Sequence, residues 1–115
     1  EAHLAVLGIA MKDYSNDDRI SPAREVISHL QAAGCTVRAY DPAVPSVYPY
    51  KVESLEKAVR GAHGILVLAR QNGIDYHNLA LFKESLVGGK PFILDTKNIY
   101  ERSEVESYGL KLETL

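Results

Sequence analysis

The sequence has little of several features that define common protein classes. It contains no tryptophan, and it contains only one cysteine, so an internal disulfide is impossible. The 13 Lys and Arg residues do not outnumber the 15 Asp and Glu residues, so the basic excess that binds a nucleic-acid backbone is missing. No apolar run approaches the roughly 18 to 20 residues of a membrane span, and the N-terminus lacks a signal-type start. We expect a cytoplasmic protein that binds neither nucleic acid nor a membrane.

Metal-ligating and nucleophilic patterns are also scarce. Cys35 has no partner cysteine, and the four histidines do not have the spacing of metal ligands. The histidines are scattered along the sequence and do not indicate a catalytic group. His77 is interpreted as a residue at the start of a helix or on the surface and not as an acid-base catalyst. We therefore predict no metal site and no catalytic residue in this chain, and a packing role for Cys35.

What the sequence does contain is an alternation of strand and helix patterns. Four apolar runs, each followed by polar residues, are typical of buried parallel strands. They lie at residues 3–9, 36–40, 64–69 and 91–94. A fifth strand is expected at residues 110–114, and the length of 115 residues fits a single domain.

Helical patterns fill the gaps between these runs. In the first, apolar residues recur at helical spacing: Ala23, Val26, Ile27 and Leu30. Ser21 is a candidate N-cap, Pro22 fits the first helical position, and Gly34 is placed to end the helix. Further helices are predicted at residues 52–61, 78–87 and 101–107. The order predicts an α/β fold: a three-layer α/β/α Rossmann-like domain with a parallel sheet of about five strands.

The most highly charged segment joins the first strand to the first helix. Residues 8–22 read GIAMKDYSNDDRISP. In an open parallel sheet, ligands bind beyond the carboxyl ends of the strands, where the strand order reverses. The dinucleotide fingerprint G-x-G-x-x-G is absent, because Gly8 is followed by Ala10 and a long charged loop. This leaves a phosphate or nucleotide site that uses the cations Lys12 and Arg19 together with the start of the helix.

The acidic residues of this loop are interpreted as structural. Asp17 and Asp18 would repel a phosphate, so we expect them to brace the loop through backbone N–H groups and through Arg19. Asp41 and Pro42 are interpreted as a turn at the end of the second strand. Residues 41–50 (DPAVPSVYPY) form a long irregular stretch, which we expect to be ordered by its aromatic residues and to cover a site.

Two motifs together resemble a known family. The pattern G-I-A-M-K-x4-D-D-x-R-x-S-P is followed by G-C-T-V-R-A-Y-D-P. They are similar to G-x-A-F-K-x-x-T-x-D-x-R-x-S-P and G-A-x-V-x-x-Y-D-P of the C-terminal, UDP-binding domain of the UDP-glucose/GDP-mannose dehydrogenase family. A weaker likeness continues through residues 64–68 and 90–98, so nearly the whole chain is covered.

The resemblance implies site residues. Met11 and Lys12 match a Phe-Lys pair that contacts the nucleotide-sugar substrate, and Arg19 matches an arginine that helps to bind the NAD cofactor. Lys97 lies where the family usually has a substrate-binding arginine; the lysine keeps the charge but loses the two-pronged fork. Cys35 does not correspond to the family's catalytic cysteine, which belongs to another part of the enzyme.

The resemblance also implies an activity for the whole enzyme. Family enzymes oxidise the C6 hydroxyl of a nucleotide sugar to a carboxylate with NAD. The N-terminal NAD-binding domain and the central domain are absent from this chain, so the chain alone is expected to be inactive. The expected partners are a UDP-sugar, the enzyme's own N-terminal domain and further copies in a homo-oligomer.

A second interpretation is a free-standing regulatory α/β module, such as a phosphoacceptor receiver domain. A receiver needs an aspartate at the end of the third strand. This chain has Ala69 and Arg70 there, which argues against that function.

Overall fold

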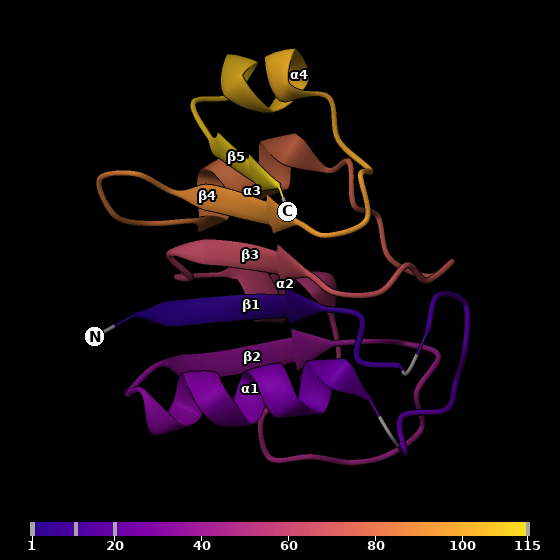
Figure 1. Ribbon diagram of the computed structural model, residues 1–115. Coiled ribbons are helices and arrows are strands. Elements are labelled where there is room, and N and C mark those ends of the chain that lie inside the picture. Colours follow the sequence, from indigo (N-terminus) through magenta and orange to yellow (C-terminus); the bar gives the residue numbers. More distant parts are fainter. Residues whose placement is uncertain (1, 11, 20, 115) are drawn as a thin grey trace.

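The chain alternates strands and helices around one parallel sheet in the computed structural model (Figure 1). The structure describes residues 2–10, 12–19 and 21–114. The strands are β1 (His3–Leu7), β2 (Thr36–Tyr40), β3 (Gly64–Val67), β4 (Phe92–Asp95) and β5 (Lys111–Thr114). The helices are α1 (Pro22–Ala32), α2 (Leu55–Val59), α3 (Leu79–Ser85) and α4 (Arg102–Ser107). The predicted order of elements is confirmed.

The strand order in the sheet is β2-β1-β3-β4-β5. All four pairs are parallel, with Leu4 opposite both Val37 of β2 and Gly64 of β3. Strand β2 lies on one side of β1, whereas β3, β4 and β5 follow one another on the other side. The strand order therefore reverses between β1 and β3. Ligand sites of open parallel sheets lie at such a point, beyond the carboxyl ends of the strands.

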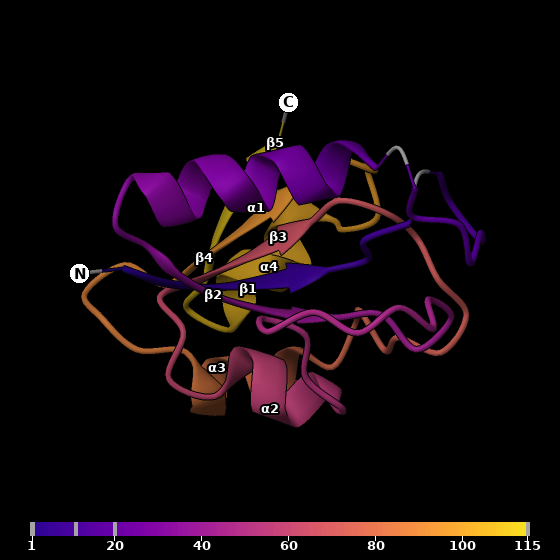
Figure 2. The same cartoon turned by 90° about the horizontal axis from the view of Figure 1, so that it is seen from below.

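Helices cover both faces of the sheet, which confirms the three-layer prediction (Figure 2). Helix α1 lies on one face, and α2 and α3 lie on the other, while α4 lies beyond the β5 edge (Figures 1 and 2). In the described part of the chain, no helix combines the length and the apolar character that a membrane crossing requires.

Two hydrophobic clusters fill the spaces between the layers. Along β1, Leu4 and Val6 belong to the cluster that contains Ile27 of α1. Their neighbours Ala5 and Leu7 belong to the cluster that contains Phe82 of α3. This is the alternation expected of a strand buried on both faces. Each large side chain that is removed from water contributes about 1.5–3 kcal/mol to folding.

Side-chain caps fix where the helices begin. The Ser21 hydroxyl accepts a hydrogen bond from the Ala23 N–H, as predicted, and Pro22 occupies the first turn of α1. Ser54 caps α2 in the same way, so this helix begins later than the predicted residue 52. The N–H of Val52 instead donates to the Ala39 carbonyl of β2.

The first strand is shorter than its apolar run. The prediction continued it to residue 9, but β1 ends at Leu7 and Gly8 takes a φ of +86°. The Ile9 N–H then donates to a carboxylate oxygen of Asp41 at 2.8 Å. The run at 64–69 also ends early, at Val67. Both segments leave the sheet to form loops at its carboxyl edge.

Candidate functional site

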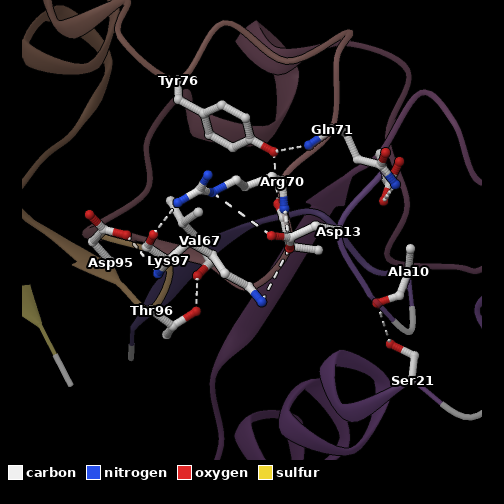
Figure 3. A network of polar contacts seen from close by, with 12 residues as sticks. Ala10, Asp13, Ser21, Val67, Arg70, Gln71, Tyr76, Asp95, Thr96 and Lys97 are labelled. Carbon is white, nitrogen blue, oxygen red and sulfur yellow. Dashed lines mark hydrogen bonds and ion pairs between the residues drawn. The ribbon is translucent and has the colours of Figure 1, made fainter. Parts of the chain in front are cut away.

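Three loops meet beyond the carboxyl ends of β1, β3 and β4. They are the loop between β1 and α1, the connection from β3 to α3, and the connection from β4 to α4 (Figure 1). Parallel strands bring these segments to one edge of the sheet, although they lie far apart in the sequence. Their polar contacts are drawn in Figure 3.

The backbone of Arg70 anchors the loop that follows β1. The Arg70 N–H donates to Asp13 Oδ1 at 2.9 Å, and the Tyr14 N–H donates to the Arg70 carbonyl at 2.8 Å. The loop is therefore held from both sides against the end of β3.

The carboxylate of Asp13 lies between two cations (Figure 3). Lys97 Nζ is 3.2 Å from Asp13 Oδ1, and Arg70 Nε is 3.8 Å from Asp13 Oδ2. Partial burial raises the pKa of Asp13, but hydrogen bonds from the Arg70 N–H and from Lys97, with both positive charges, outweigh it and lower the pKa. Asp13 is therefore ionised at neutral pH.

Arg70 also ties the second and third loops together. Its Nη2 donates to the Lys97 carbonyl at 2.6 Å. The Lys97 N–H in turn donates to Asp95 Oδ1 at 2.9 Å. The other Asp95 oxygen accepts the N–H groups of Ile99 and Tyr100 at 2.7 and 3.0 Å. Buried Asp95 thus fixes the loop that carries Lys97.

A second buried carboxylate, that of Asp41 after β2, joins the β1 loop to the connection that follows β3. Asp41 Oδ2 accepts the Ile9 N–H at 2.8 Å and Gln71 Nε2 at 3.1 Å, while Oδ1 accepts the Ala43 N–H at 3.0 Å. Gln71 Nε2 also donates to the Ser15 carbonyl at 2.5 Å. The predicted turn at Asp41 is confirmed, and the same side chain also holds the start of the β1 loop.

Two buried tyrosines support this arrangement from the α3 side. The Tyr76 hydroxyl accepts the Gln71 N–H and donates to the Ala69 carbonyl, both at 2.7 Å. The Tyr100 hydroxyl donates to the Tyr76 carbonyl at 2.6 Å. Burial raises the pKa of both phenols, so they remain neutral donors.

The far end of the β1 loop is bonded to residues 41–50. Asp18 is buried and accepts hydrogen bonds from the hydroxyls of Tyr48 and Ser46. Tyr48 stacks on Tyr50 with ring centroids 5.2 Å apart, and the Arg24 guanidinium lies over Tyr48 at the same distance. The aromatic residues order this stretch as predicted. The acceptor role of Asp18 differs from the expected one, because its donors are hydroxyls of another loop.

Arg19 lies at this end, away from Lys97. It lines a hollow of about 700 Å³ together with residues of α1 and the two stacked tyrosines. Its Nε and Nη2 donate to the two oxygens of Asp17 at 3.0 and 2.8 Å, and its N–H donates to Asp17 as well. The bracing role predicted for Asp17 is confirmed. The side chain of Arg19 is 85% exposed and remains accessible to a ligand.

This pair gives a direct test of the loop geometry. The hydrogen bonds from the Arg19 side chain and N–H lower the pKa of Asp17 to about 2. In a carbon-13 NMR titration, we expect the Asp17 carboxyl to titrate near that value. Arg19→Ala removes the side-chain donors and should move the pKa upward, part of the way to the usual 3.8. An unchanged Asp17 titration in Arg19→Ala would contradict the pairing.

The structure separates the predicted site residues into two places. Lys12 is exposed on the β1 loop, beside Asp13, and forms no ion pair with another described residue. Lys97 is half-buried and contacts Asp13, whereas Arg19 lies with α1. Met11 falls outside the described residues. Within the ranges that the structure covers, no cluster of His, Cys, Asp or Glu could hold a metal ion.

The sequence analysis missed Asp13, Arg70 and Gln71 as site residues. A signal for Arg70 and Gln71 was available, because both directly follow the third apolar run, and polar residues after a parallel strand lie at its carboxyl edge. Asp13 could not be distinguished from its charged neighbours, since its partners lie 57 or more residues along the chain.

Comparisons with known proteins identify the family of this chain. Residues 5–102 match the sequence model of the UDP-glucose/GDP-mannose dehydrogenase family, UDP binding domain. UDP-N-acetyl-D-mannosamine dehydrogenase of Methanocaldococcus jannaschii is 36% identical over 97% of this chain and 26% of its own length. UDP-glucose 6-dehydrogenase TuaD of Bacillus subtilis is 30% identical over 92% of this chain and 24% of its own length.

Solved structures give the same result. NDP-N-acetyl-D-galactosaminuronic acid dehydrogenase of Methanosarcina mazei superposes with a TM-score of 0.88 at 27% identity, over 98% of this chain and 24% of that one. UDP-D-ManNAc dehydrogenase of Pyrococcus horikoshii gives 0.78 at 31% identity, over 99% and 25%. The chain thus spans about a quarter of the length of these relatives. With a family match over residues 5–102, the chain belongs to the UDP-glucose/GDP-mannose dehydrogenase family and corresponds to its UDP-binding domain.

Proposed function

We propose that this chain binds the nucleotide part of a UDP-sugar within an NAD-dependent nucleotide-sugar 6-dehydrogenase. Such an enzyme oxidises the C6 hydroxyl of the sugar to a carboxylate and so supplies uronic acid precursors of polysaccharides. The observation that carries the proposal is the contact of Lys97 with Asp13 of the β1 loop, which also carries Lys12, at the carboxyl edge of the sheet and next to the point where the strand order reverses. The names of the relatives, which are UDP-sugar dehydrogenases, support the substrate class.

The proposed role of these lysines is to neutralise the diphosphate. Lys12 is exposed at the loop that crosses the edge of the sheet, and its ammonium group can turn toward an anion. Lys97 is held by the loop that Asp95 fixes, so its position is defined before a ligand arrives. For Met11, which lies outside the described residues, an apolar contact with the substrate is proposed from the family resemblance alone.

NAD is proposed to be bound mainly by another domain of the whole enzyme. The residues of this chain fit a limited contribution to NAD binding, because Arg19 has an exposed guanidinium that lines the hollow beside α1. NAD would accept the hydride. Arg19 would bind a phosphate group of NAD in place of its present partner Asp17. Assembly into a homo-oligomer is part of the same proposal.

The receiver interpretation is not supported by the edge of β3. The residues that follow this strand are Leu68, Ala69 and Arg70, and none of them can accept a phosphoryl group as an aspartate does. Arg70 is instead engaged with Asp13 and with the Lys97 carbonyl.

A titration of the chain with UDP, and with free glucose as comparison, tests the proposal. Part of the site would be supplied by other domains, so we expect a dissociation constant of about 1 mM for UDP, or about −4 kcal/mol, and no detectable glucose binding. Amide shifts in an NMR spectrum should cluster at residues 8–19 and around Lys97. Lys12→Gln should weaken UDP binding severalfold.

Lys83→Gln serves as the control, since Lys83 is an exposed lysine of α3. It should bind UDP as the unmodified chain does. Shift changes that cluster elsewhere, or no change at high UDP, would contradict the proposed site.

A further inference from the structure

Two cations at the candidate site share a single carboxylate. Asp13 pairs with Lys97 Nζ at 3.2 Å and lies 3.8 Å from Arg70 Nε. The side chains of Arg70 and Lys97 are 40% and 31% exposed, so both can be reached from solvent. One negative charge against two positive ones leaves this cluster with a net positive charge.

The hydrogen bonding of Arg70 is incomplete as well. Its Nε is buried and, among the described residues, has no hydrogen-bond acceptor, because the distance to Asp13 exceeds that of a hydrogen bond. Its Nη2 is bonded to the Lys97 carbonyl. The protein therefore uses only part of the five-donor fork that a guanidinium offers.

A hollow adjoins this guanidinium. It has a volume of about 430 Å³ and is lined by Arg70, Gln71, Tyr76, Tyr14 and Asn98, with further residues of the same loops. Tyr14 and Asn98 have φ values of 60° and 58°, in a region that non-glycine residues rarely adopt. Such backbone conformations persist where the surrounding structure enforces them, and they cluster at ligand sites.

We propose that Asp13 is an internal counter-ion that occupies an anion site formed by Arg70 and Lys97, and that the phosphate groups of the bound nucleotide displace it. Arg70 is then a specificity residue for the charged part of the ligand. This inference rests on the proposed function, because it assumes that a nucleoside diphosphate binds at this edge of the sheet.

The geometry supports an exchange of anions. Asp13 belongs to the exposed, charged β1 loop, so its carboxylate can turn away while Arg70 and Lys97 stay on their own loops. A diphosphate carries more negative charge than one carboxylate and can take both prongs of the Arg70 fork. Arg70 would thereby supply the paired hydrogen bonds that a lysine at position 97 cannot form.

The neighbouring carboxylates do not compete for these cations. Asp95 accepts three backbone N–H groups, and Asp41 accepts two backbone N–H groups and the Gln71 amide. Both are buried and occupied. Asp13 is thus the carboxylate that the described contacts place against Arg70 and Lys97.

The test compares UDP with uridine, which has the same base and ribose but no phosphate. Arg70→Gln should weaken UDP binding about tenfold, as expected when a charge-assisted pair is lost, and leave uridine binding unchanged. Asp13→Asn keeps an oxygen for the Arg70 N–H but removes the competing charge, so it should tighten UDP binding severalfold. Dissociation constants come from NMR titrations, with a thermal melt for each variant.

Arg38→Gln is the matched control, because Arg38 Nη2 also donates to a backbone carbonyl, that of Arg60, at 2.6 Å. It should change neither titration. A measurement on the unmodified chain needs no variant: the carbon-13 shift of the Asp13 carboxyl should move when UDP is added.

The outcomes separate the two claims. Failure of the unmodified chain to bind UDP refutes the proposed function and this inference with it. UDP binding with equal losses for UDP and uridine in Arg70→Gln overturns the role of Arg70 and leaves the proposed function standing. Unchanged or weaker UDP binding by Asp13→Asn, or a silent Asp13 carboxyl, overturns the counter-ion role.

Discussion

Replacing Gly8 by alanine should be among the most damaging single substitutions in this chain. Gly8 has a φ of +86°, and an added Cβ would lie 2.3 Å from the Ala69 carbonyl oxygen. The left-handed backbone costs an alanine about 1–2 kcal/mol, and crowding against a fixed backbone costs about 1–3 kcal/mol more. We expect a loss of about 3 kcal/mol or more, and a fall in Tm on the order of 10 °C, in a thermal melt.

Gly34→Ala is the matched control for this substitution. Gly34 has a φ of +95°, but among the described residues other than its chain neighbours none has an atom within 4 Å of the position of its added Cβ. It should therefore lose only the backbone contribution of about 1–2 kcal/mol. Equal losses for the two variants would show that the contact with Ala69 is not the cause.

Removal of the Asp95 carboxylate should have an effect of similar size. Asp95 is 2% exposed and accepts the N–H groups of Lys97, Ile99 and Tyr100. Asp95→Ala leaves these donors without their acceptor, at about 1–3 kcal/mol for each that water cannot reach. We expect the free energy of unfolding, measured with urea, to fall by about 3–5 kcal/mol.

Two further variants separate charge from burial in this result. Asp95→Asn keeps one acceptor oxygen and should lie between Asp95→Ala and the unmodified chain. In the described part of the chain, the Asp17 carboxylate is bonded only to the N–H and the guanidinium of exposed Arg19. Asp17→Ala should therefore leave the Tm nearly unchanged. A Tm of Asp95→Ala as high as that of Asp17→Ala would contradict the assigned role of Asp95.

The sequence was sufficient to predict the fold because each element carries its own local signal. Short apolar runs predicted the strands of a parallel sheet, and Ser21 with Pro22 predicted the start of α1. The ends of elements were less predictable. The apolar pattern continues through Ile9, but its N–H is taken by Asp41, a contact between distant residues that local pattern does not reveal.

The candidate site was predictable only in part for the same reason. Lys12 and Arg19 were predicted from the charged loop after the first strand, and Lys97 from a family resemblance; the structure places Lys97 against Asp13 and Arg19 beside α1. The pairing of Asp13 with Arg70 and Lys97 depends on how three loops fold together at the sheet edge. Composition and spacing contain no information about that pairing, so charge alone could not distinguish a ligand-facing cation from one with an internal partner.

The long-range bonds of the β1 loop have a consequence for the order of folding. Its anchors join Ile9 to Asp41, Asp13 to Arg70 and Ser15 to Gln71 across separations of 32, 57 and 56 residues. Closing loops of this length costs conformational entropy that the local segment cannot recover by itself. The β1 loop therefore becomes ordered only after β2 and β3 have paired with β1, and in a nascent chain the candidate site forms late, once the sequence beyond β3 has been synthesised.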